Sequence, residues 1–281
     1  MRVGFIGLGN IGMPMARHLV EAGHEVVGLD SDPARTRDLA GTGAVAAEAP
    51  LDLRECAVVC LAVPDDGTAD AVVRESGLLA ELEAGSSVLL HSTLLPPTAI
   101  RLAEAGQDHR VRVHDAPVSG GAARALSGEL TLMVGGSPDE QAAGVLEALG
   151  TPVPTGPVGS AAAVKLANQL SMLAALGALH EGLAIAGHFG ADEETVLDVL
   201  RTSTGASWSA ENWGFFDDLA GTYDDAGVAV RYRPWSKDLW DVVATAREAE
   251  LTVPIAAVLA QTMPELVEGH ARAARKGEER S

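Results

Sequence analysis

A single lysine lies inside a long apolar stretch in the second half of the chain. From Gly159 to Gly187 the sequence is rich in alanine and leucine and lacks proline, which predicts one long helix. Lys165, Asn168 and Gln169 follow one another at i, i+3 and i+4, so their side chains emerge on one face of that helix. Such a stripe is most often solvated surface. A lysine among Ala, Val and Leu near a helix start is also placed to exchange a proton with a substrate.

A glycine-rich loop near the N-terminus indicates a second kind of chemistry. The apolar run Arg2–Ile6 ends at Gly7, the segment GLGNIG adds Gly9 and Gly12, and helical spacing follows. An acid, Asp30, ends the next strand-like run about 20 residues later, which completes the strong form of the dinucleotide signature. Glycine permits the tight turn, the approach of the pyrophosphate and close packing of the helix. The residues assigned to the cofactor here are Gly7, Gly9, Asn10, Ile11, Gly12 and Asp30.

The identity of the acid favours NAD over NADP. Asp30 can accept hydrogen bonds from the adenosine ribose, and Ser31 and Asp32 follow it. The two carboxylates would repel a 2′-phosphate. Arg35 and Arg37 lie close in sequence and leave NADP open, although we expect both on the solvated face of the next helix.

Strand-like and helical segments then alternate. Strands are expected at Val58–Val63, Ser86–His91 and Val111–Ala116, with helices at Thr68–Leu82 and Pro97–Ala105. This alternation predicts an α/β Rossmann-type, doubly wound parallel sheet covered on both faces.

The turns that follow these strands should face the cofactor, because ligands lie at the carboxyl ends of parallel strands. We therefore assign Pro64 and Thr93 to cofactor binding. A third turn contains Ser119, Gly120 and Gly121, whose backbone N–H groups and hydroxyl could seat a substrate carboxylate. The alternative is a glycine-rich turn without a ligand.

Composition limits the classes of partner. The chain has 281 residues and a net charge of −19, which argues against nucleic acid or an anionic membrane as a partner. Local backbone dipoles can still bind a small anion. Cys56 and Cys60 are expected to be buried thiols in a reduced cytoplasm. We expect no apolar run of membrane-spanning length, and the chain opens with a strand, so we expect a cytoplasmic protein.

Several motifs together resemble one enzyme family. GFIGLGNIGMPMARHL (Gly4–Leu19) is similar to the cofactor signature of the β-hydroxyacid dehydrogenases, and DAPVSGGAARALSGELTLMVGG (Asp115–Gly136) to their substrate signature. Within that family the chain resembles the 3-hydroxyisobutyrate dehydrogenases and tartronate semialdehyde reductases, and Ala206–Ser209 is similar to a segment of the hydroxyisobutyrate enzymes. Lys165 in VKLAN resembles the family's catalytic lysine, and Lys237 resembles a lysine that reaches the cofactor.

The resemblance implies transfer of a hydride between nicotinamide and a small 3-hydroxy acid, or its aldehyde or ketone. It implies that Lys165 is the general acid and base. A free lysine has a pKa of about 10.4 and is a poor base at neutral pH. The helix N-terminus, the positive nicotinamide and burial all disfavour the ammonium form, so we expect the pKa of Lys165 to be lowered.

The chain departs from the family pattern at two places. The family has two successive asparagines after the lysine, whereas this chain has Asn168 and Gln169, both assigned here to substrate binding. If Gln169 holds the substrate, its longer side chain should change the preferred length or branching. If its amide turns away, Asn168 or the arginines near Lys237 would hold the anion. A neutral replacement within the same hydrogen bond is a third alternative. The segment Arg231–Trp235 also differs, being less apolar than expected.

We expect two domains, a cofactor-binding domain over residues 1–159 and an all-helical substrate and dimerisation domain over 160–281. Further helices are predicted at Asp192–Leu200, Trp208–Leu219, Trp235–Ala249 and Ala256–Ala274, and the tail from Arg275 to Ser281 is expected to be disordered. The long helix exceeds what one domain can cover, which predicts a homodimer or homotetramer. The histidines form no ligand cluster, so no metal is expected.

Two other functions remain open from the sequence. An imine reductase would share this architecture, although that family generally has another residue at the position of Lys165. A non-catalytic NAD-binding sensor would need no proton donor. The lysine and the Ser119 turn favour the dehydrogenase.

Overall fold

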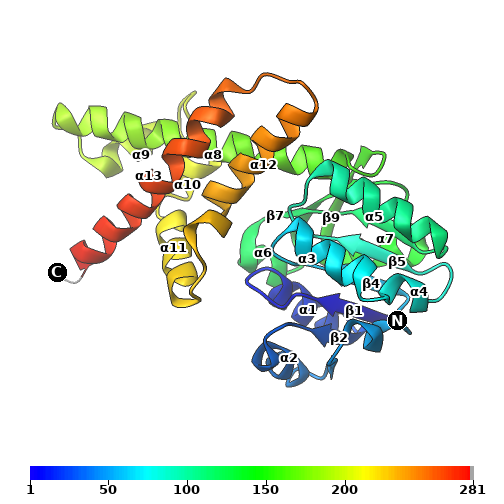
Figure 1. The fold of residues 1–281 in the computed structure, drawn as a ribbon. Helices are drawn as coiled ribbons and strands as arrows, with labels where there is room; N and C mark the ends of the chain where they lie inside the picture. The colour runs from blue at the N-terminus through cyan, green and yellow to red at the C-terminus, as the bar shows by residue number, and fades with distance from the viewer. Residues whose placement is uncertain (279–281) are drawn as a thin grey trace. The chain divides into compact units, whose positions relative to one another are not determined.

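Six parallel strands form a central sheet in the order β3-β2-β1-β4-β5-β6 (Figure 1). In the computed structural model, which describes residues 1–278, these are β1 (Arg2–Ile6), β2 (Glu25–Leu29), β3 (Val45–Ala46), β4 (Val58–Leu61), β5 (Ser87–Leu90) and β6 (Arg112–Asp115). The strand order reverses around β1, whose neighbours are β2 and β4. Ligands bind at such a reversal, outside the carboxyl ends of the strands. The predicted doubly wound parallel sheet is confirmed.

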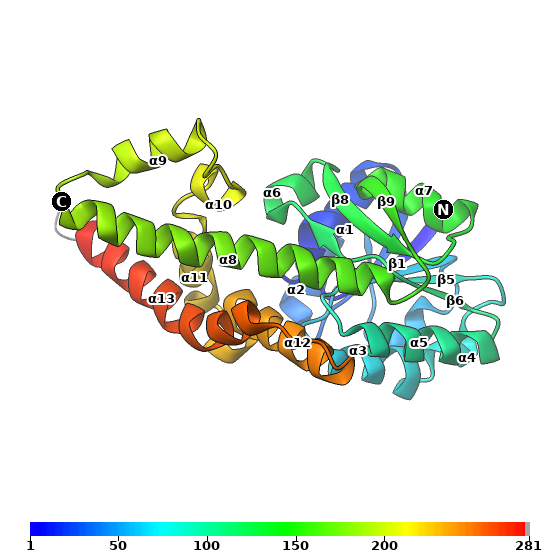
Figure 2. The same ribbon diagram turned by 90° about the horizontal axis from the view of Figure 1, so that it is seen from above.

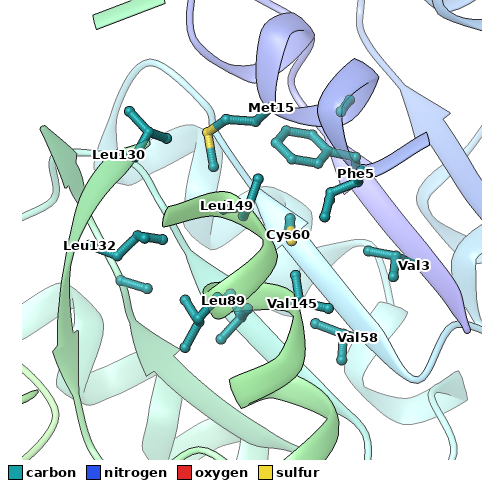
Figure 3. Packing of buried hydrophobic residues seen from close by; sticks show 14 of the residues in the cluster. Val3, Phe5, Met15, Val58, Cys60, Leu89, Leu130, Leu132, Val145 and Leu149 are labelled. Carbon is teal, nitrogen blue, oxygen red and sulfur yellow. The ribbon is translucent and has the colours of Figure 1, made fainter. Parts of the chain in front are cut away.

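The sheet is buried on both faces, which explains why its strands are apolar throughout. In β4, Val58 and Cys60 belong to one core cluster, and Val59 and Leu61 belong to the other. Successive side chains of a strand point to opposite faces, so a strand with four buried residues needs cover on both sides. Figure 3 shows the first cluster, in which Leu89 and other strand residues meet side chains from helices and from a second sheet.

Helices supply that cover. They are α1 (Gly12–Glu21), α2 (Pro33–Ala40), α3 (Asp66–Asp70), α4 (Leu78–Glu81), α5 (Pro96–Asp108), α6 (Gly121–Leu126) and α7 (Glu140–Leu149), with a short 3-10 turn at Pro50–Leu53. The single helix predicted over Thr68–Leu82 is wrong. The chain forms α3, then a π-helical turn at Ala71–Glu75, and restarts after Gly77, whose φ of +84° ends the helix.

A three-stranded sheet in the order β7-β8-β9 was not predicted. It consists of β7 (Val118–Ser119), β8 (Leu130–Gly135) and β9 (Gly150–Gly156). β7 is too short to give a periodic pattern. β9 contains Pro152 and Pro154, and proline normally argues against a strand. β9 tolerates both because it lies at the edge of the sheet, paired only with β8.

The chain divides into two compact units, with the boundary inside helix α8 after Lys165. The second unit is helical, as predicted: α8 (Ser160–His188) continues into it, followed by α9 (Glu193–Arg201), α10 (Trp208–Glu211), α11 (Phe215–Asp225), a 3-10 turn (Val230–Tyr232), α12 (Pro234–Glu248) and α13 (Pro254–Glu278) (Figure 2). The helix predicted over Trp208–Leu219 is interrupted, because Gly214 adopts a left-handed φ of +91°.

The expected disorder from Arg275 onwards is corrected in part. α13 continues to Glu278, and Arg275 donates a hydrogen bond from Nη2 to Asp224 at 2.7 Å. The remaining positions of the predicted tail, 279–281, lie outside the described residues.

The expectation about apolar runs also needs correction. α8 has 29 residues and an 18-residue window of mean hydropathy 1.4, so by length and composition alone it could cross a membrane. A long helix that is covered by other protein meets the same criteria. Only 22% of that window is buried within the chain, so much of an apolar helix surface is left to be covered.

Candidate active site

The glycine loop between β1 and α1 has the shape that a dinucleotide requires. A Cβ on Gly7 would lie 2.2 Å from the Ala62 carbonyl oxygen, and a Cβ on Gly12 would lie 1.9 Å from the Gly7 carbonyl oxygen. These two glycines are therefore needed by the fold itself. Gly9 is different, because a Cβ there would meet nothing within 4 Å. The open space beside Gly9 fits a pyrophosphate approaching the backbone. Asn10 is exposed and Ile11 is half-buried in the same loop.

Asp30 lies where the sequence placed it, at the end of β2 beside this loop. Its carboxylate accepts hydrogen bonds from Leu8 N at 2.6 Å and from Asp32 N at 2.8 Å. Each carboxylate oxygen has further lone pairs, so both remain able to accept from ribose hydroxyls. Arg35 Nη1 lies 3.8 Å from Asp30 and Arg35 Nε lies 3.9 Å from Asp32. The guanidinium thus reaches back to the acid from the following helix.

The turns after β4 and β5, which contain Pro64 and Thr93, are held together by the side chains of Ser92 and Asp66, neither of which was assigned to the site from the sequence. Val63 N donates to Ser92 Oγ at 2.8 Å, and Leu95 N donates to Asp66 Oδ1 at 2.9 Å. These two bonds fix the relative positions of two turns at the carboxyl edge of the sheet. In the sequence, Ser92 and Asp66 could have been found as polar side chains that follow a buried strand.

Lys165 lies against the segment that carries the predicted carboxylate seat. Its side chain is buried, and Nζ donates a hydrogen bond of 2.9 Å to the carbonyl oxygen of Val118, the residue before Ser119. Gly120 and Gly121 have φ values of +138° and +75°, which other residues adopt only with strain. The structure therefore brings together Lys165 and the Ser119 turn, which are far apart in sequence.

The start of α8 modifies the electrostatic account of Lys165. Asp115 Oδ2 accepts from Gly159 N at 3.0 Å and from Ala162 N at 2.8 Å, so a buried carboxylate caps the helix. A carboxylate at this position offsets the positive end of the helix. The helix N-terminus therefore disfavours the Lys165 ammonium less than expected, and burial of Nζ is the main reason to expect an amine that gives up its proton.

A buried histidine follows β5. His91 lies with Nδ1 2.8 Å from the carbonyl oxygen of Ala116, and burial lowers the pKa of its imidazole to about 4. It is therefore neutral at pH 7, with Nδ1 as the donor. It adds no positive charge to the carboxyl edge of the sheet. Among the described residues, no group of three or more His, Cys, Asp or Glu side chains could hold a metal.

In the second unit, Gln169 is the centre of a polar network between α8 and α12. Its Nε2 donates to Asp238 Oδ2 at 2.6 Å, and its Oε1 accepts from Asn168 Nδ2 at 3.1 Å. Lys237 Nζ lies 3.5 Å from the other Asp238 oxygen and 2.6 Å from Asp241 Oδ2. Asn168, Gln169 and Lys237, three of the residues assigned from the sequence, thus belong to one network.

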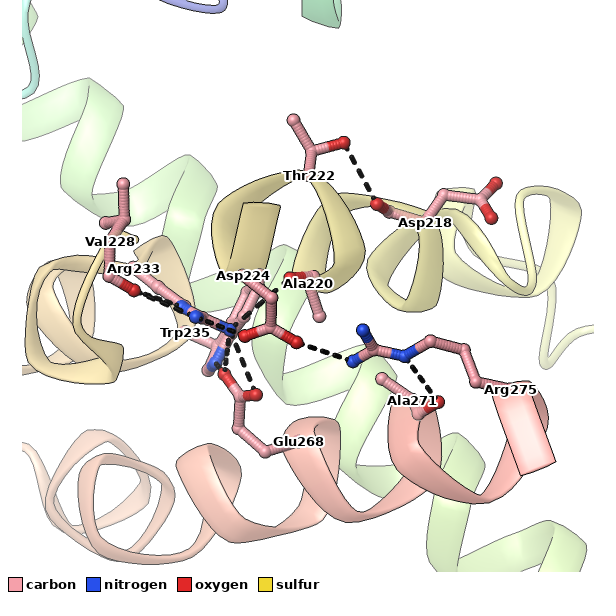
Figure 4. Close-up of polar contacts among 10 residues, drawn as sticks. All are labelled: Asp218, Ala220, Thr222, Asp224, Val228, Arg233, Trp235, Glu268, Ala271 and Arg275. Atoms are coloured by element: carbon pink, nitrogen blue, oxygen red, sulfur yellow. Dashed lines mark hydrogen bonds and ion pairs between the residues drawn. The ribbon is translucent and has the colours of Figure 1, made fainter. Parts of the chain in front are cut away.

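Arg233, one of the arginines near Lys237, does not form a free anion site. Arg233 is 3% exposed and donates to both oxygens of Glu268 at 2.9 and 3.0 Å, and to Asp224 at 2.6 Å (Figure 4). Trp235 Nε1 donates to the same glutamate at 3.0 Å. Arg233 and Trp235, in the polar segment before Lys237, therefore belong to a buried structural network. The alternative in which Arg233 holds the substrate anion is not supported.

Two family models match the chain. Residues 2–161 match the NAD binding domain of 6-phosphogluconate dehydrogenase. Residues 159–277 match the model described as the NAD-binding domain of NADP-dependent 3-hydroxyisobutyrate dehydrogenase. Together they cover nearly all of the described residues.

Individual relatives agree with these models. The 3-hydroxyisobutyrate dehydrogenase of Pseudomonas aeruginosa is 31% identical over 268 residues, which are 91% of this chain and 89% of the relative. The chain belongs to the β-hydroxyacid dehydrogenase family. An NAD-dependent L-serine dehydrogenase from the same organism is 32% identical over 215 residues, covering 75% and 72% of the two chains.

Solved structures of 3-hydroxyisobutyrate dehydrogenases are similar in fold to this β-hydroxyacid dehydrogenase. The Mycobacterium tuberculosis 3-hydroxyisobutyrate dehydrogenase with L-serine superposes with a TM-score of 0.80 at 25% identity, over 96% of this chain and 94% of the other. An imine reductase from Myxococcus stipitatus shares the fold at 19% identity, with a TM-score of 0.66 over 95% and 94% of the chains. The chain is thus an NAD-dependent oxidoreductase of the 3-hydroxyacid dehydrogenase type, and the imine reductases are more distant.

Proposed function

We propose that this enzyme oxidises a small, anionic 3-hydroxy acid with NAD, with Lys165 as the general base. The observation that carries the proposal is the contact of the buried Lys165 Nζ with the Val118 carbonyl, directly before the Ser119 turn. Relatives named for 3-hydroxyisobutyrate and L-serine support a short substrate with a carboxylate and a hydroxyl. Ser119, Gly120 and Gly121 would bind the carboxylate, and Asn168 would bind near the hydroxyl.

The glycine loop and Asp30 would hold NAD, whose nicotinamide would supply the hydride acceptor for the carbon that carries the hydroxyl. As that C–H bond breaks, the hydroxyl proton passes to the neutral Lys165 amine and the C–O bond becomes a carbonyl. In the reverse direction the Lys165 ammonium returns the proton to the oxygen. The Val118 carbonyl fixes Nζ in place, so little rearrangement is needed before proton transfer.

The proposal is tested by NADH formation across a panel of short 3-hydroxy acids, with 2-hydroxy acids and cyclic imines as comparison substrates. We expect turnover to be confined to the 3-hydroxy acids and their aldehydes or ketones. Turnover of imines in preference to hydroxy acids, or binding of NAD without turnover of any panel member, would replace this proposal with one of the two alternatives.

Cofactor preference gives a specific prediction at Asp30. The wild type should use NAD more efficiently than NADP, because the buried carboxylate accepts from a ribose hydroxyl and repels a phosphate. Asp30→Asn is nearly isosteric and removes the charge, although its NH₂ group can no longer accept from one of the two backbone N–H groups; Arg35 lies close enough to meet a 2′-phosphate. We expect the ratio of kcat/KM for NAD over NADP to fall about tenfold or more, the scale of a charged hydrogen bond.

Asp38→Asn is the matched control, because Asp38 is an exposed acid of α2 that pairs with Arg17 at 2.9 Å. The preference of the Asp38→Asn variant for NAD over NADP should equal that of the wild type. A wild type that prefers NADP would overturn the assignment of Asp30.

We also propose that two copies associate through α8, as a homodimer or a dimer of dimers in the cytoplasm. Support comes from the apolar window of α8, of which only 22% is buried, and from Ile185, which is 64% exposed. Burial of apolar surface at about 25 cal/mol per Å² favours such association. Light scattering at micromolar concentration should give at least twice the 28.9 kDa of one chain. Ile185→Asp should shift the mass towards the monomer, and a monomeric wild type would contradict the proposal.

A further inference from the structure

The amide of Gln169 has a fixed orientation. Its Nε2 donates to Asp238 at 2.6 Å, and a carboxylate accepts hydrogen bonds but cannot donate them. The NH₂ group must therefore face Asp238, and Oε1 must face Asn168, whose Nδ2 lies 3.1 Å away. Both Gln169 and Asp238 are buried, at 6% and 4% exposure, so water competes little for either bond.

The length of the glutamine side chain is what makes this contact. An asparagine at position 169 would carry its amide one carbon–carbon bond, about 1.5 Å, closer to α8. The 2.6 Å contact with Asp238 would then open to about 4 Å, which is too long for a hydrogen bond. The departure from the family pattern thus gives this chain a direct link from α8 to α12.

The orientation of Gln169 also determines that of Asn168. One N–H of Asn168 is used by Gln169 Oε1, so its amide retains one N–H and the carbonyl oxygen Oδ1. An amide in this state can accept from a substrate hydroxyl and donate to a substrate oxygen. Gln169 directs Oε1 and Nε2 to protein partners and is only 6% exposed, so its remaining N–H and lone pair are largely shielded from a substrate.

We propose that Gln169 is a positioning residue: it couples Asp238 on α12 to Asn168 on α8, and it orients Asn168 for the substrate without contacting the substrate itself. This inference rests on the proposed function, in which Asn168 binds near the substrate hydroxyl. It replaces the expectation that the longer side chain of Gln169 selects the length or branching of the substrate.

The kinetic test uses Gln169→Met, which keeps the length and removes both hydrogen bonds. A positioning role predicts that kcat/KM falls about tenfold for every 3-hydroxy acid of a panel, with the order of preference unchanged. Asn168→Ala should then cost less in the Gln169→Met background than in the wild type, because the two residues act as one unit. A changed order of substrate preference would overturn the inference. So would losses in kcat/KM that multiply in the double variant.

A second cycle requires no turnover. Thermal unfolding of the full chain is compared for Gln169→Met, Asp238→Leu and the double variant. The loss of Tm in the double variant should be clearly smaller than the sum of the single losses, because both variants remove the same bond. Gln261→Met is the matched control, since Gln261 is exposed on α13 and donates to the carbonyl of Ala257 within its own helix. Gln261→Met combined with Asp238→Leu should give additive losses.

The two cycles distinguish a failure of the positioning role of Gln169 from a failure of the proposed function on which it rests. Coupling in unfolding without turnover of any 3-hydroxy acid would remove the proposed function and leave the contact between Gln169 and Asp238 established. Turnover with additive unfolding losses would keep the function and overturn the positioning role of Gln169.

Discussion

Lys165→Met should lose about 10²–10⁴-fold in turnover, the range that general acid–base catalysis contributes, while it still binds NAD. The methionine has a similar length and is apolar, so it suits a buried position beside apolar helix residues. It cannot take the hydroxyl proton. Turnover is measured with a 3-hydroxy acid in excess, and NAD binding is measured by fluorescence titration.

Lys165→Arg separates proton transfer from positive charge. Arginine keeps the charge but does not deprotonate in proteins, so this variant should be as inactive as Lys165→Met. In the wild type the rate of hydride transfer should rise with pH through a group that titrates below the value of about 10.4 for a free lysine. Near-normal turnover in either variant would remove Lys165 from the mechanism.

Arg233→Met should lower the free energy of unfolding by about 3–5 kcal/mol, because it leaves buried carboxylate charge without its partner. Arg233 donates two hydrogen bonds to Glu268 from a single nitrogen, and both side chains are less than 10% exposed. Its other nitrogens reach Asp224 and the carbonyl of Val228, so one guanidinium joins α11, α12 and α13 (Figure 4). Urea unfolding followed by circular dichroism measures the change.

Arg272→Met provides the control for this effect on the same helix. Arg272 pairs with Glu265 at 3.3 Å, but the two side chains are 54% and 86% exposed. Water screens such a pair, so the variant should change the free energy of unfolding by less than about 1 kcal/mol. Equal losses in the free energy of unfolding of the two variants would show that burial of Arg233 does not determine its contribution to stability.

The cofactor-binding half of the fold could be predicted because its signals are local. Gly7 and Gly12 cannot carry a Cβ, and Asp30 follows them at the spacing of one strand, helix and strand. The alternation of apolar strands and helices then follows from burial on both faces of the sheet. Lys165 was identified by its apolar surroundings and by family resemblance.

Other features depend on contacts between distant residues, which leave no periodic pattern. Gln169 and Asp238 are 69 positions apart, and Arg233 and Glu268 are 35 apart. Before these pairs were seen, Arg233 could be read as a substrate ligand as readily as a structural residue. The cap that Asp115 places on α8, 44 positions away, was hidden for the same reason. The edge strand β9 was not predicted because it contains Pro152 and Pro154, and proline normally argues against a strand.

The central claim is that a hydride passes from the hydroxyl-bearing carbon of a 3-hydroxy acid to NAD. It is tested most directly with a substrate deuterated at that carbon, followed by mass spectrometry of the reduced cofactor. We predict one deuterium on the nicotinamide ring for each molecule oxidised by the wild type, and labelled cofactor formed about 10²–10⁴-fold more slowly with Lys165→Met. Reduced cofactor without the label, or labelled cofactor formed equally well by Lys165→Met, would contradict the account.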